Sequence, residues 1–413
     1  DRSIDAPYVE SMATTTDISQ HPPVDAAKVE TFSEQLLGHF NSSFVTSMVD
    51  VGHRTGLFDA LGQGPATSPA LAARSGLQER YVREWLGAIV TAGVADYEST
   101  TEEYSLPVEH AACLAGDTPL NVAPLSLLSG LLAQHIQPVA RCFREGGGVP
   151  YAEYRPDFTD VMDRLGRATF DALLVDVIVP LAGDLRDRLE DGIDVADIGC
   201  GTGHTTNLLA RGFPRSRFVG YDIAADAIDH ARTEAAEYGL DNVSFEVQDV
   251  AQLPAQEALG AVFAFDAIHD QTNPAGVLAR VHEALVPGGV FAMFDIRASS
   301  HLENNLENPM APMLYGISTL HCLTISLSDG GAGLGTVWGE ELALKMLGDA
   351  GFVDTVVHEV PNDPLDSLYV ARKRPNRSVG SGLTADSGKP RCISGSSDLS
   401  GGDGGEDLPV GGP

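Results

Sequence analysis

The stretch IDVADIGCGTGHTTNLLAR, residues 193–211, decides the fold class of this chain. Residues 193–199 are typical of a strand buried in a parallel sheet. They run into the glycine-rich turn 199–203 and then into a predicted helix over residues 204–211. Glycines after a strand let a ligand approach the backbone closely, and a helix N-terminus supplies unpaired N–H groups. The stretch therefore predicts a ligand-binding strand–turn–helix of an α/β, Rossmann-like domain.

Strand and helix signals alternate through residues 191–373. Asp222 follows Gly199 by 23 residues, at the tip of the second predicted strand, where a carboxylate suits the two hydroxyls of a ribose. Gln248-Asp249-Val250 ends the third strand and His269-Asp270 follows the fourth. Ligands of open α/β sheets bind at the carboxyl ends of strands, so these side chains are expected to share one site. The expected strands are 193–199, 217–221, 243–247, 261–267, 290–296, 353–360 and 367–372, and the expected helices are 204–211, 224–238, 274–285 and 339–350.

The glycine spacing bears on which nucleotide this site binds. The dinucleotide fingerprint Gly-x-Gly-x-x-Gly/Ala, counted from Gly199, needs a small residue at position 204, where this chain has His204. The third glycine comes one place early, at Gly203, and Asp197 lies two residues before the first. An NAD(P)-dependent oxidoreductase is therefore disfavoured but stays open as an alternative.

The pattern Asp197-x-Gly199-x-Gly201-x-Gly203 resembles motif I of class I S-adenosylmethionine (SAM) methyltransferases. Four further features are similar to that family and occur in the same order: the acid after strand two, Gln-Asp after strand three, Pro-Gly-Gly at 287–289 and a closing strand pair. The resemblance implies a Rossmann-like, seven-stranded class I methyltransferase sheet over residues 191–374. It also implies SAM as cofactor and S-adenosyl-L-homocysteine as product.

The same resemblance implies a role for each matching position. The three glycines would cradle the amino-acid part of SAM, and Asp197 would orient their loop or reach the ammonium through water. Asp222 would hold the ribose, and Asp249 would accept from the adenine amino group. The full implied set is Asp197, Gly199, Gly201, Gly203, Asp222, Ile223, Asp249, Val250, Phe265 and Asp266.

The N-terminal part, residues 27–110, has the order helix, turn, helix, hairpin of a winged helix. Helices are expected over 70–75, capped by Thr67, and over 78–92, with β-like runs at 94–98 and 103–106. An earlier helix is expected to bury a stripe of Phe40, Phe44, Met48, Val51 and Leu57. Residues 66–110 hold three arginines, no lysine and seven carboxylates, a net charge of −4, which favours a dimerisation module over a DNA reader.

The domain order resembles that of plant-type small-molecule O-methyltransferases and of bacterial winged-helix methyltransferases whose substrates are unassigned. That resemblance implies a homodimer formed through residues 27–110, a helical cap over 111–190 and a base in the His269-Asp270 pair, although Gln271 replaces the Trp that usually follows. Neutral histidine suits proton removal, so we expect His269 as the general base and Asp270 to orient it. The candidate substrate contacts from the cap and from the insertion 297–337 are Tyr151, Tyr154, Phe158, Met162, His301, Tyr315 and His321.

Composition limits the remaining choices. The formal charge of −32 disfavours nucleic acid and anionic membranes as partners and mildly favours cationic ligands. Five scattered cysteines without a CxxC pair predict a cytoplasmic protein, and adjacent residues such as His321-Cys322 rarely ligate one ion, so we expect no metal. No apolar run predicts a signal peptide. Residues 1–26 and the Gly- and Ser-rich 375–413 are expected to be disordered.

The sequence therefore predicts a SAM-dependent methyltransferase acting on a small molecule, on an oxygen, with an acceptor that is neutral and aromatic or polyketide-like. The alternatives are a SAM-binding winged-helix transcriptional regulator and the NAD(P)-dependent oxidoreductase. A methyltransferase acting on protein also stays open.

Overall fold

The computed structural model describes residues 24–253, 256–361 and 363–376. The expected disordered segments, 1–26 and 375–413, lie almost wholly outside these residues. Within the described part of the chain, none of the helices combines the length and the apolar character that crossing a membrane requires.

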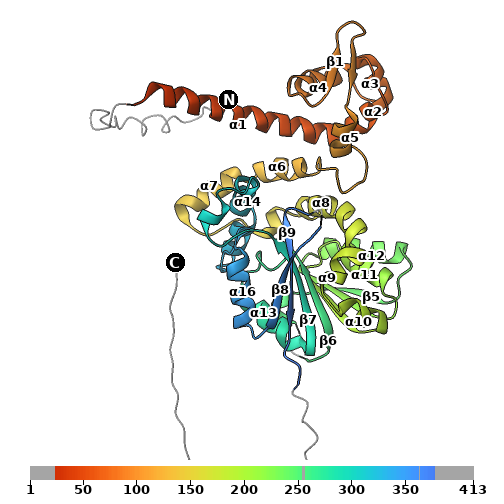
Figure 1. Cartoon of the computed structure of the whole chain (residues 1–413), viewed down its shortest axis with the longest axis vertical. Helices are drawn as coiled ribbons and strands as arrows, with labels where there is room; N and C mark the ends of the chain where they lie inside the picture. The colour runs from red at the N-terminus through yellow and green to blue at the C-terminus, as the bar shows by residue number, and fades with distance from the viewer. Residues whose placement is uncertain (1–23, 254–255, 362, 377–413) are drawn as a thin grey trace, which may run out of the picture. The chain divides into compact units, whose positions relative to one another are not determined.

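The N-terminal region has the predicted winged-helix order (Figure 1). Thr67 caps its second short helix by accepting from the backbone N–H of Ala70 at 3.4 Å. Phe58 and Trp85 meet edge to face at 5.2 Å in the core, and the indole N–H of Trp85 donates to the carbonyl of Met48 at 2.8 Å. The elements are α1 (Ala26–Thr55), α2 (Leu57–Gly62), α3 (Ser68–Ser75), α4 (Glu79–Thr91), β1 (Asp96–Glu98) and β2 (Glu103–Ser105).

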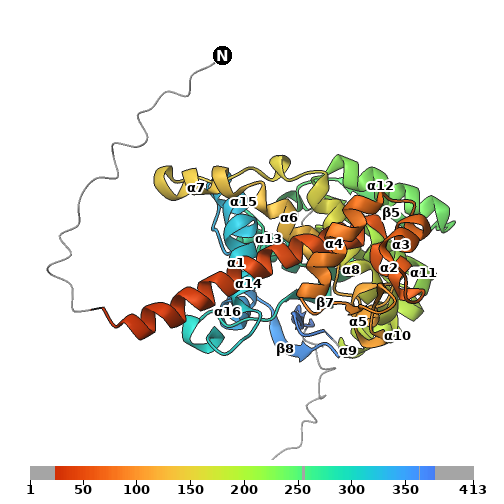
Figure 2. The same ribbon diagram turned by 90° about the horizontal axis from the view of Figure 1, so that it is seen from above.

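The expected burial of the α1 stripe is wrong for most of its members. Leu57 is buried and Met48 half-buried, but Phe40, Val51 and Phe44 are exposed, the last at 72%. The reason is that α1 continues well beyond the winged-helix core, and its first half has no neighbouring element among the described residues (Figures 1 and 2). The helical periodicity is correct, but no surface formed by the described residues covers the first half of the helix.

The helical cap and the insertion after the fifth strand of the main sheet share one apolar core. The hydroxyl of Tyr154 donates to the carbonyl of Leu320 at 2.5 Å, and the N–H of Val149 donates to the hydroxyl of Thr324 at 2.9 Å. The cap comprises α5 (Val108–Leu114), α6 (Leu125–Ala133), α7 (Ile136–Glu145), η3 (Tyr151–Glu153), α8 (Asp157–Leu173), η4 (Leu174–Ile178), α9 (Val179–Leu181) and α10 (Leu185–Asp191). The insertion comprises η6 (Leu302–Asn305), α14 (Ala311–Leu320) and α15 (Cys322–Ser328).

The predicted seven-stranded sheet is confirmed, with the order β5-β4-β3-β6-β7-β9-β8. Within this sheet, strands β3 to β7 pair in parallel, and β9 runs antiparallel to both β7 and β8. Pro287-Gly288-Gly289 lies inside β7 rather than before it. The strands are β3 (Asp194–Ile198), β4 (Arg217–Asp222), β5 (Val243–Val247), β6 (Leu259–Phe265), β7 (Leu285–Ile296), β8 (Val353–Glu359) and β9 (Asp366–Arg372).

Helices cover both faces of this sheet, and each face has its own apolar core. Leu208, Phe213 and Phe263 belong to one core, and Leu278, Phe291 and Leu347 to the other. The parallel arrangement brings the ends of β3, β4, β5, β6 and β7 to one edge, which is where the predicted site lies. The remaining helices are α11 (His204–Gly212), α12 (Ala225–Glu237), η5 (Val250–Gln252), α13 (Pro274–Ala284) and α16 (Glu340–Asp349).

Candidate active site

The glycine-rich turn after β3 is held by β4. The N–H of Gly199 donates to the carbonyl of Tyr221 at 2.8 Å, and the N–H of Gly201 donates to Oδ2 of Asp222 at 2.9 Å. Gly203 begins α11 with φ +73°, and a Cβ there would lie 2.5 Å from the side chain of Ala231. By contrast, a Cβ on Gly201 would meet nothing within 4 Å. Only glycine fits at 203, while the backbone at 201 lies open for a ligand to approach.

Asp197 lies beneath this turn with 1% of its surface exposed. Its Oδ2 accepts from the hydroxyls of Thr205 (3.1 Å) and Thr206 (2.5 Å), whereas its Oδ1 has no partner among the described residues. Burial raises the pKa of Asp197 to about 7, against the opposing effect of the two threonines. A cationic group brought near Oδ1 would stabilise the ionised form.

The remaining predicted cofactor residues also lie at the ends of β4, β5 and β6. Asp222 is buried, and its Oδ1 accepts from the N–H of Ala224 at 2.8 Å. Asp249 is exposed and caps η5 by accepting from the N–H of Ala251 at 2.9 Å. Three of the others differ in exposure, with Ile223 exposed, Val250 buried and Phe265 half-buried. Asp266 follows β6 with φ +49°, a left-handed backbone that re-aims the chain there.

His269 is buried, with 3% of its surface exposed, between two carboxylates. Its Nδ1 donates to Oδ1 of Asp295 at 2.8 Å, and its Nε2 lies 3.4 Å from Oδ1 of Asp270. The structure therefore gives the orienting position at Nδ1 to Asp295, on β7, rather than to the predicted Asp270. Burial alone would lower the pKa of His269, but Asp295 and Asp270 together raise it well above its ordinary value.

Asp295 and Trp338 are residues of the site that the sequence analysis missed. Oδ1 of Asp295 accepts three N–H groups: His269 Nδ1, the Trp338 indole (3.0 Å) and the backbone of Ile296 (2.9 Å). This fixes the carboxylate and, through it, the imidazole ring. The sequence signal for Asp295 is a carboxylate within the apolar run of β7. The same pattern is equally typical of a strand-end carboxylate without a functional role.

The predicted substrate residues fall into two sets. Phe158 of α8 stacks on His321 at 3.6 Å between ring centres, and Tyr151 and Tyr154 approach the same imidazole edge-on. Nδ1 of His321 lies 3.8 Å from Asp270, and burial lowers its pKa to about 4. Met162 is half-buried on α8, whereas His301 and Tyr315 are exposed, and the hydroxyl of Tyr315 accepts from Asn305 at 3.2 Å.

Two groups of three side chains have metal-ligand atoms within 4.8 Å of one another, and both include His269. One adds Asp270 and Cys322, and the other adds Asp266 and Asp295. In the second group, Oδ1 of Asp295 is already occupied by three N–H donors. The expectation that no metal binds stays a prediction.

A charged network joins the cap to the glycine turn. Thr202 of the turn donates to Asp163 of α8 at 2.9 Å, and Arg167 of α8 donates to Asp163 through two nitrogens. Arg167 also donates to Glu234 of α12 at 2.7 Å, beside the buried His204. Burial would raise the pKa of Glu234, but these partners lower it to about 2. His204, the residue that departs from the dinucleotide fingerprint, is thus part of this ion network.

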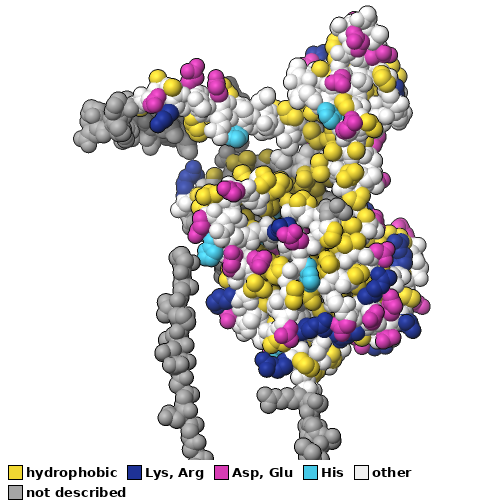
Figure 3. All heavy atoms as spheres, viewed as in Figure 1, with side chains coloured by type: hydrophobic (Ala, Val, Ile, Leu, Met, Phe, Trp, Pro, Cys, Tyr) yellow, Lys and Arg dark blue, Asp and Glu magenta, His cyan; other side chains and the backbone are white. Residues whose placement is uncertain are grey.

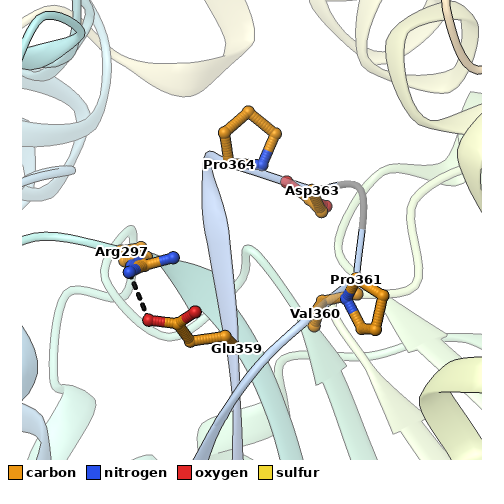
Figure 4. Close-up of a pocket in the computed structure, with 6 residues that line it drawn as sticks. All are labelled: Arg297, Glu359, Val360, Pro361, Asp363 and Pro364. Atoms are coloured by element: carbon orange, nitrogen blue, oxygen red, sulfur yellow. Dashed lines mark hydrogen bonds and ion pairs between the residues drawn. The ribbon is translucent and has the colours of Figure 1, made fainter.

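A hollow of about 500 Å³ lies at the turn between β8 and β9 (Figure 4). Arg297, Glu359 and Asp363 are among its lining residues, and Arg297 pairs with Glu359. Neither His269 nor the glycine turn lines it, so this hollow is not the site assembled above.

Two family models match separate parts of the chain. Residues 43–116 match an Rv2258c-like winged HTH domain, and residues 189–341 match a methyltransferase domain. Over 125 residues the chain is 31% identical to trans-aconitate 2-methyltransferase of Acidovorax sp. strain JS42, covering 30% of this chain and 44% of that protein. Over 168 residues it is 27% identical to sterol 24-C-methyltransferase of Debaryomyces hansenii, covering 40% and 41%. The chain thus spans less than half the length of the curated relatives it matches.

Solved structures with the same fold cover most of the chain. Human N-acetylserotonin methyltransferase in complex with SAM covers 86% of this chain and 99% of its own, with a TM-score of 0.63 and 18% identity. An O-methyltransferase family protein from Burkholderia thailandensis covers 86% and 100%, with a TM-score of 0.60 and 15% identity. The chain thus combines a region, residues 43–116, that matches an Rv2258c-like winged helix-turn-helix domain with a region, residues 189–341, that matches a methyltransferase domain.

Proposed function

We propose that this protein is a SAM-dependent methyltransferase that methylates an oxygen of a small molecule. The observation that carries the proposal is the convergence, at one sheet edge, of an open glycine turn, a carboxylate with an unpartnered oxygen and a carboxylate-held histidine. SAM supplies an electrophilic methyl group on a positively charged sulfur. The curated relatives are named for different acceptors, so the methylated atom rests on the site rather than on them.

The residues at this edge fit SAM at two points. The free Oδ1 of Asp197 suits a cationic amino group, and the open side of Gly201 suits close approach by the amino-acid part. Asp222 would hold the ribose, with Ile223 and Val250 against the adenine. In its unprotonated form, which its raised pKa restricts to alkaline pH unless a bound cation offsets the two carboxylates, His269 would take the proton of the acceptor hydroxyl at Nε2 while Asp295 holds Nδ1. The acceptor oxygen bonds to the methyl carbon as the carbon–sulfur bond breaks, and the sulfur keeps the electron pair.

The homodimer is part of the same proposal. Seven large apolar residues of α1 are exposed along a largely continuous helical stripe: Val29, Phe32, Leu36, Leu37, Phe40, Phe44 and Val51. A monomer rarely leaves so long an apolar face in water, and a second copy of α1 would cover it. The cytoplasmic location stays a prediction, since it rests on the cysteine pattern alone.

Calorimetric titration with SAM and S-adenosyl-L-homocysteine, with NADH beside them, tests the cofactor. We expect micromolar binding of both sulfur ligands and no heat with NADH. Binding of NADH alone would favour the oxidoreductase. Sulfur-ligand binding without turnover on any phenol, carboxylate or amine, together with salt-dependent binding to duplex DNA, would favour the regulator.

A further inference from the structure

Three side chains with metal-binding atoms meet at the turn between β6 and α13. His269 and Asp270 lie in that turn, and Cys322 begins α15 in the insertion. The ligand atoms of these residues, which we term the His-Asp-Cys cluster, all lie within 4.8 Å of one another. The first two residues are neighbours in sequence, yet the turn places Nε2 of His269 only 3.4 Å from Oδ1 of Asp270. The insertion thus adds a sulfur to a nitrogen and an oxygen at the sheet edge.

These separations suit a single four-coordinate ion. Around a tetrahedral Zn²⁺, neighbouring nitrogen, oxygen and sulfur ligands lie about 3.3–3.8 Å apart. The distance of 3.4 Å between Nε2 of His269 and Oδ1 of Asp270 already falls in that range. Because the remaining pairs lie within 4.8 Å, they need to approach by no more than about 1.5 Å.

Two of the three ligands are held from behind in a way that suits metal binding. Nδ1 of His269 donates to Oδ1 of Asp295 at 2.8 Å, which leaves the lone pair of the neutral ring on Nε2. A carboxylate in that position is typical of histidines that bind metals. The Sγ of Cys322 accepts from the hydroxyl of Thr336 at 2.9 Å and lies 3.6 Å from Nδ1 of His321. Both groups can donate to a thiolate, the imidazole as its Nδ1–H tautomer.

The third ligand, Asp270, has an oxygen that lacks a partner. Its Oδ1 is buried and accepts no hydrogen bond from the described residues. Buried polar atoms are paired in most native structures, so this oxygen indicates a group that binds there. The side chain of Asp270 is 21% exposed, so the cluster is not sealed from solvent.

We propose that the His-Asp-Cys cluster binds one transition-metal ion of the zinc type through Nε2 of His269, Oδ1 of Asp270 and Sγ of Cys322. A nitrogen, an oxygen and a sulfur together favour Zn²⁺ over Mg²⁺ and Ca²⁺, which prefer oxygen ligands alone. The thiol proton of Cys322, and any proton on Nε2 of His269, leaves to solvent as the ion binds. The thiolate and the carboxylate then balance the charge of the ion, and water takes the fourth position. This proposal replaces the expectation from the sequence that the chain binds no metal.

Cobalt provides the test, because Co²⁺ takes the same ligands as Zn²⁺ and is coloured. The full chain, reduced and free of added thiols, is titrated with Co²⁺ in the absorption spectrometer. We expect one ion per chain, with a thiolate-to-cobalt charge-transfer band and the strong visible bands of a four-coordinate ion. Zn²⁺ should abolish both signals, since it binds such sites more tightly than Co²⁺. A spectrum without a charge-transfer band at saturating Co²⁺ would overturn the site.

Variants assign the sulfur. Cys322→Ser should lose the charge-transfer band and weaken Zn²⁺ binding by at least about tenfold, because the thiolate ligand is gone. The matched control is Cys142→Ser, which removes a half-buried thiol of α7 and should keep the band and the affinity of the wild type. A band that persists in Cys322→Ser, or that disappears in the control alone, would place the metal elsewhere.

A measurement on the wild-type protein does not depend on how the variants fold. X-ray absorption with one equivalent of Zn²⁺ should show one sulfur at about 2.3 Å and nitrogen or oxygen ligands at about 2.0–2.2 Å. A first shell of nitrogen and oxygen only would contradict ligation by Cys322.

A bound ion would block proton transfer at His269, and this consequence rests on the proposed function. Nε2 cannot hold an ion and accept the proton of a hydroxyl at the same time. With an acceptor found among the phenols, carboxylates and amines, one equivalent of Zn²⁺ should lower turnover by at least about tenfold, and EDTA should restore it. In Cys322→Ser the same loss, relative to that variant without metal, should require at least about tenfold more Zn²⁺. Turnover that Zn²⁺ raises or leaves unchanged would overturn the blocking role.

Failure of this inference and failure of the proposed function give different results. If S-adenosyl-L-homocysteine does not bind, the methyltransferase proposal fails whatever the cobalt spectrum shows. If it binds and the charge-transfer band is missing, only the metal site is wrong.

Discussion

At the scale of single residues, the imidazole of His269 is fixed by a carboxylate oxygen, Oδ1 of Asp295, that accepts three N–H groups. Asp295 accepts from His269, Trp338 and its own chain neighbour, so the ring is held with Nε2 on the opposite side. That arrangement is what a general base requires, because the proton-accepting nitrogen must be presented in one orientation.

His269→Gln should lower kcat by about 10²–10⁴-fold, because the acceptor hydroxyl loses its base. The affinity for S-adenosyl-L-homocysteine should stay within about twofold, since His269 is not among the residues assigned to it. Steady-state kinetics and calorimetry on the same preparation check both halves. Unchanged turnover would remove His269 from the mechanism, and a parallel loss of cofactor affinity would assign it to cofactor packing instead.

If Asp197 contacts the amino group of SAM, as proposed above, the affinity for SAM should depend on pH. The pKa of Asp197 is raised to about 7, so the carboxylate is largely neutral at pH 6 and largely ionised at pH 8. If the ionised form holds the amino group, SAM should bind about tenfold more tightly at pH 8 than at pH 6. Asp197→Asn should bind SAM weakly at both pH values. A wild-type affinity that does not change over this range would exclude a charged contact from Asp197.

At the scale of elements, helix α8 links the aromatic side chains around His321 to the glycine-rich turn after β3. It carries Phe158 toward His321, Asp163 toward Thr202 about one and a half turns later, and Arg167 toward Glu234 one turn after that. The partner Glu234 is buried, so removing Arg167 would leave a carboxylate without its main cation.

Arg167→Met should therefore lower the free energy of unfolding by about 2–4 kcal/mol, measured by urea denaturation. The matched control is Arg186→Met, whose partners Asp176 and Glu190 are exposed. That control should change stability by less than about 1 kcal/mol. Similar losses in the two variants would mean that the α8 network is no more than a surface ion pair.

Helix α1 carries the second prediction at this scale. Replacing Phe40 and Phe44 together by Glu should convert a dimer into a monomer, because charges placed on the stripe could not be buried against a second copy. Light scattering gives the mass, and circular dichroism checks that the fold remains. A wild-type protein that is already monomeric would contradict the dimer.

Elements of the main sheet could be predicted closely from the sequence because their signals are local. The strand before Gly199, the helix stop at Gly239 and the closing strand pair each depend on residues within a few positions. The errors arose where the deciding contact is distant in sequence. Asp295 reaches His269 across 26 residues, and Phe44 is exposed because none of the elements in the described part of the chain covers it. Periodicity shows which face is apolar, but it does not show what covers that face.

At the scale of the whole molecule, the excess of negative charge disfavours nucleic acid as a binding partner. Acidic side chains surround the β1–β2 hairpin, the element that would approach DNA in a winged-helix reader (Figure 3). Asp96, Glu98, Glu102 and Glu103 lie on or beside it. We expect no binding to duplex DNA in fluorescence anisotropy at 50 mM salt, because phosphate contacts require cations that this hairpin lacks. Micromolar binding to duplex DNA that weakens as salt is added would instead support the alternative of a winged-helix transcriptional regulator.

The two tryptophans of this chain stand in separate structural units of the fold. Trp85 donates to Met48 within the winged-helix core, and Trp338 donates to the carboxylate that holds His269. With Trp85→Phe, all indole emission would come from a ring hydrogen-bonded to Asp295, the carboxylate that holds His269. The protein thus contains its own optical probe, by which filling of the site or a change in its protonation can be followed in real time without a label.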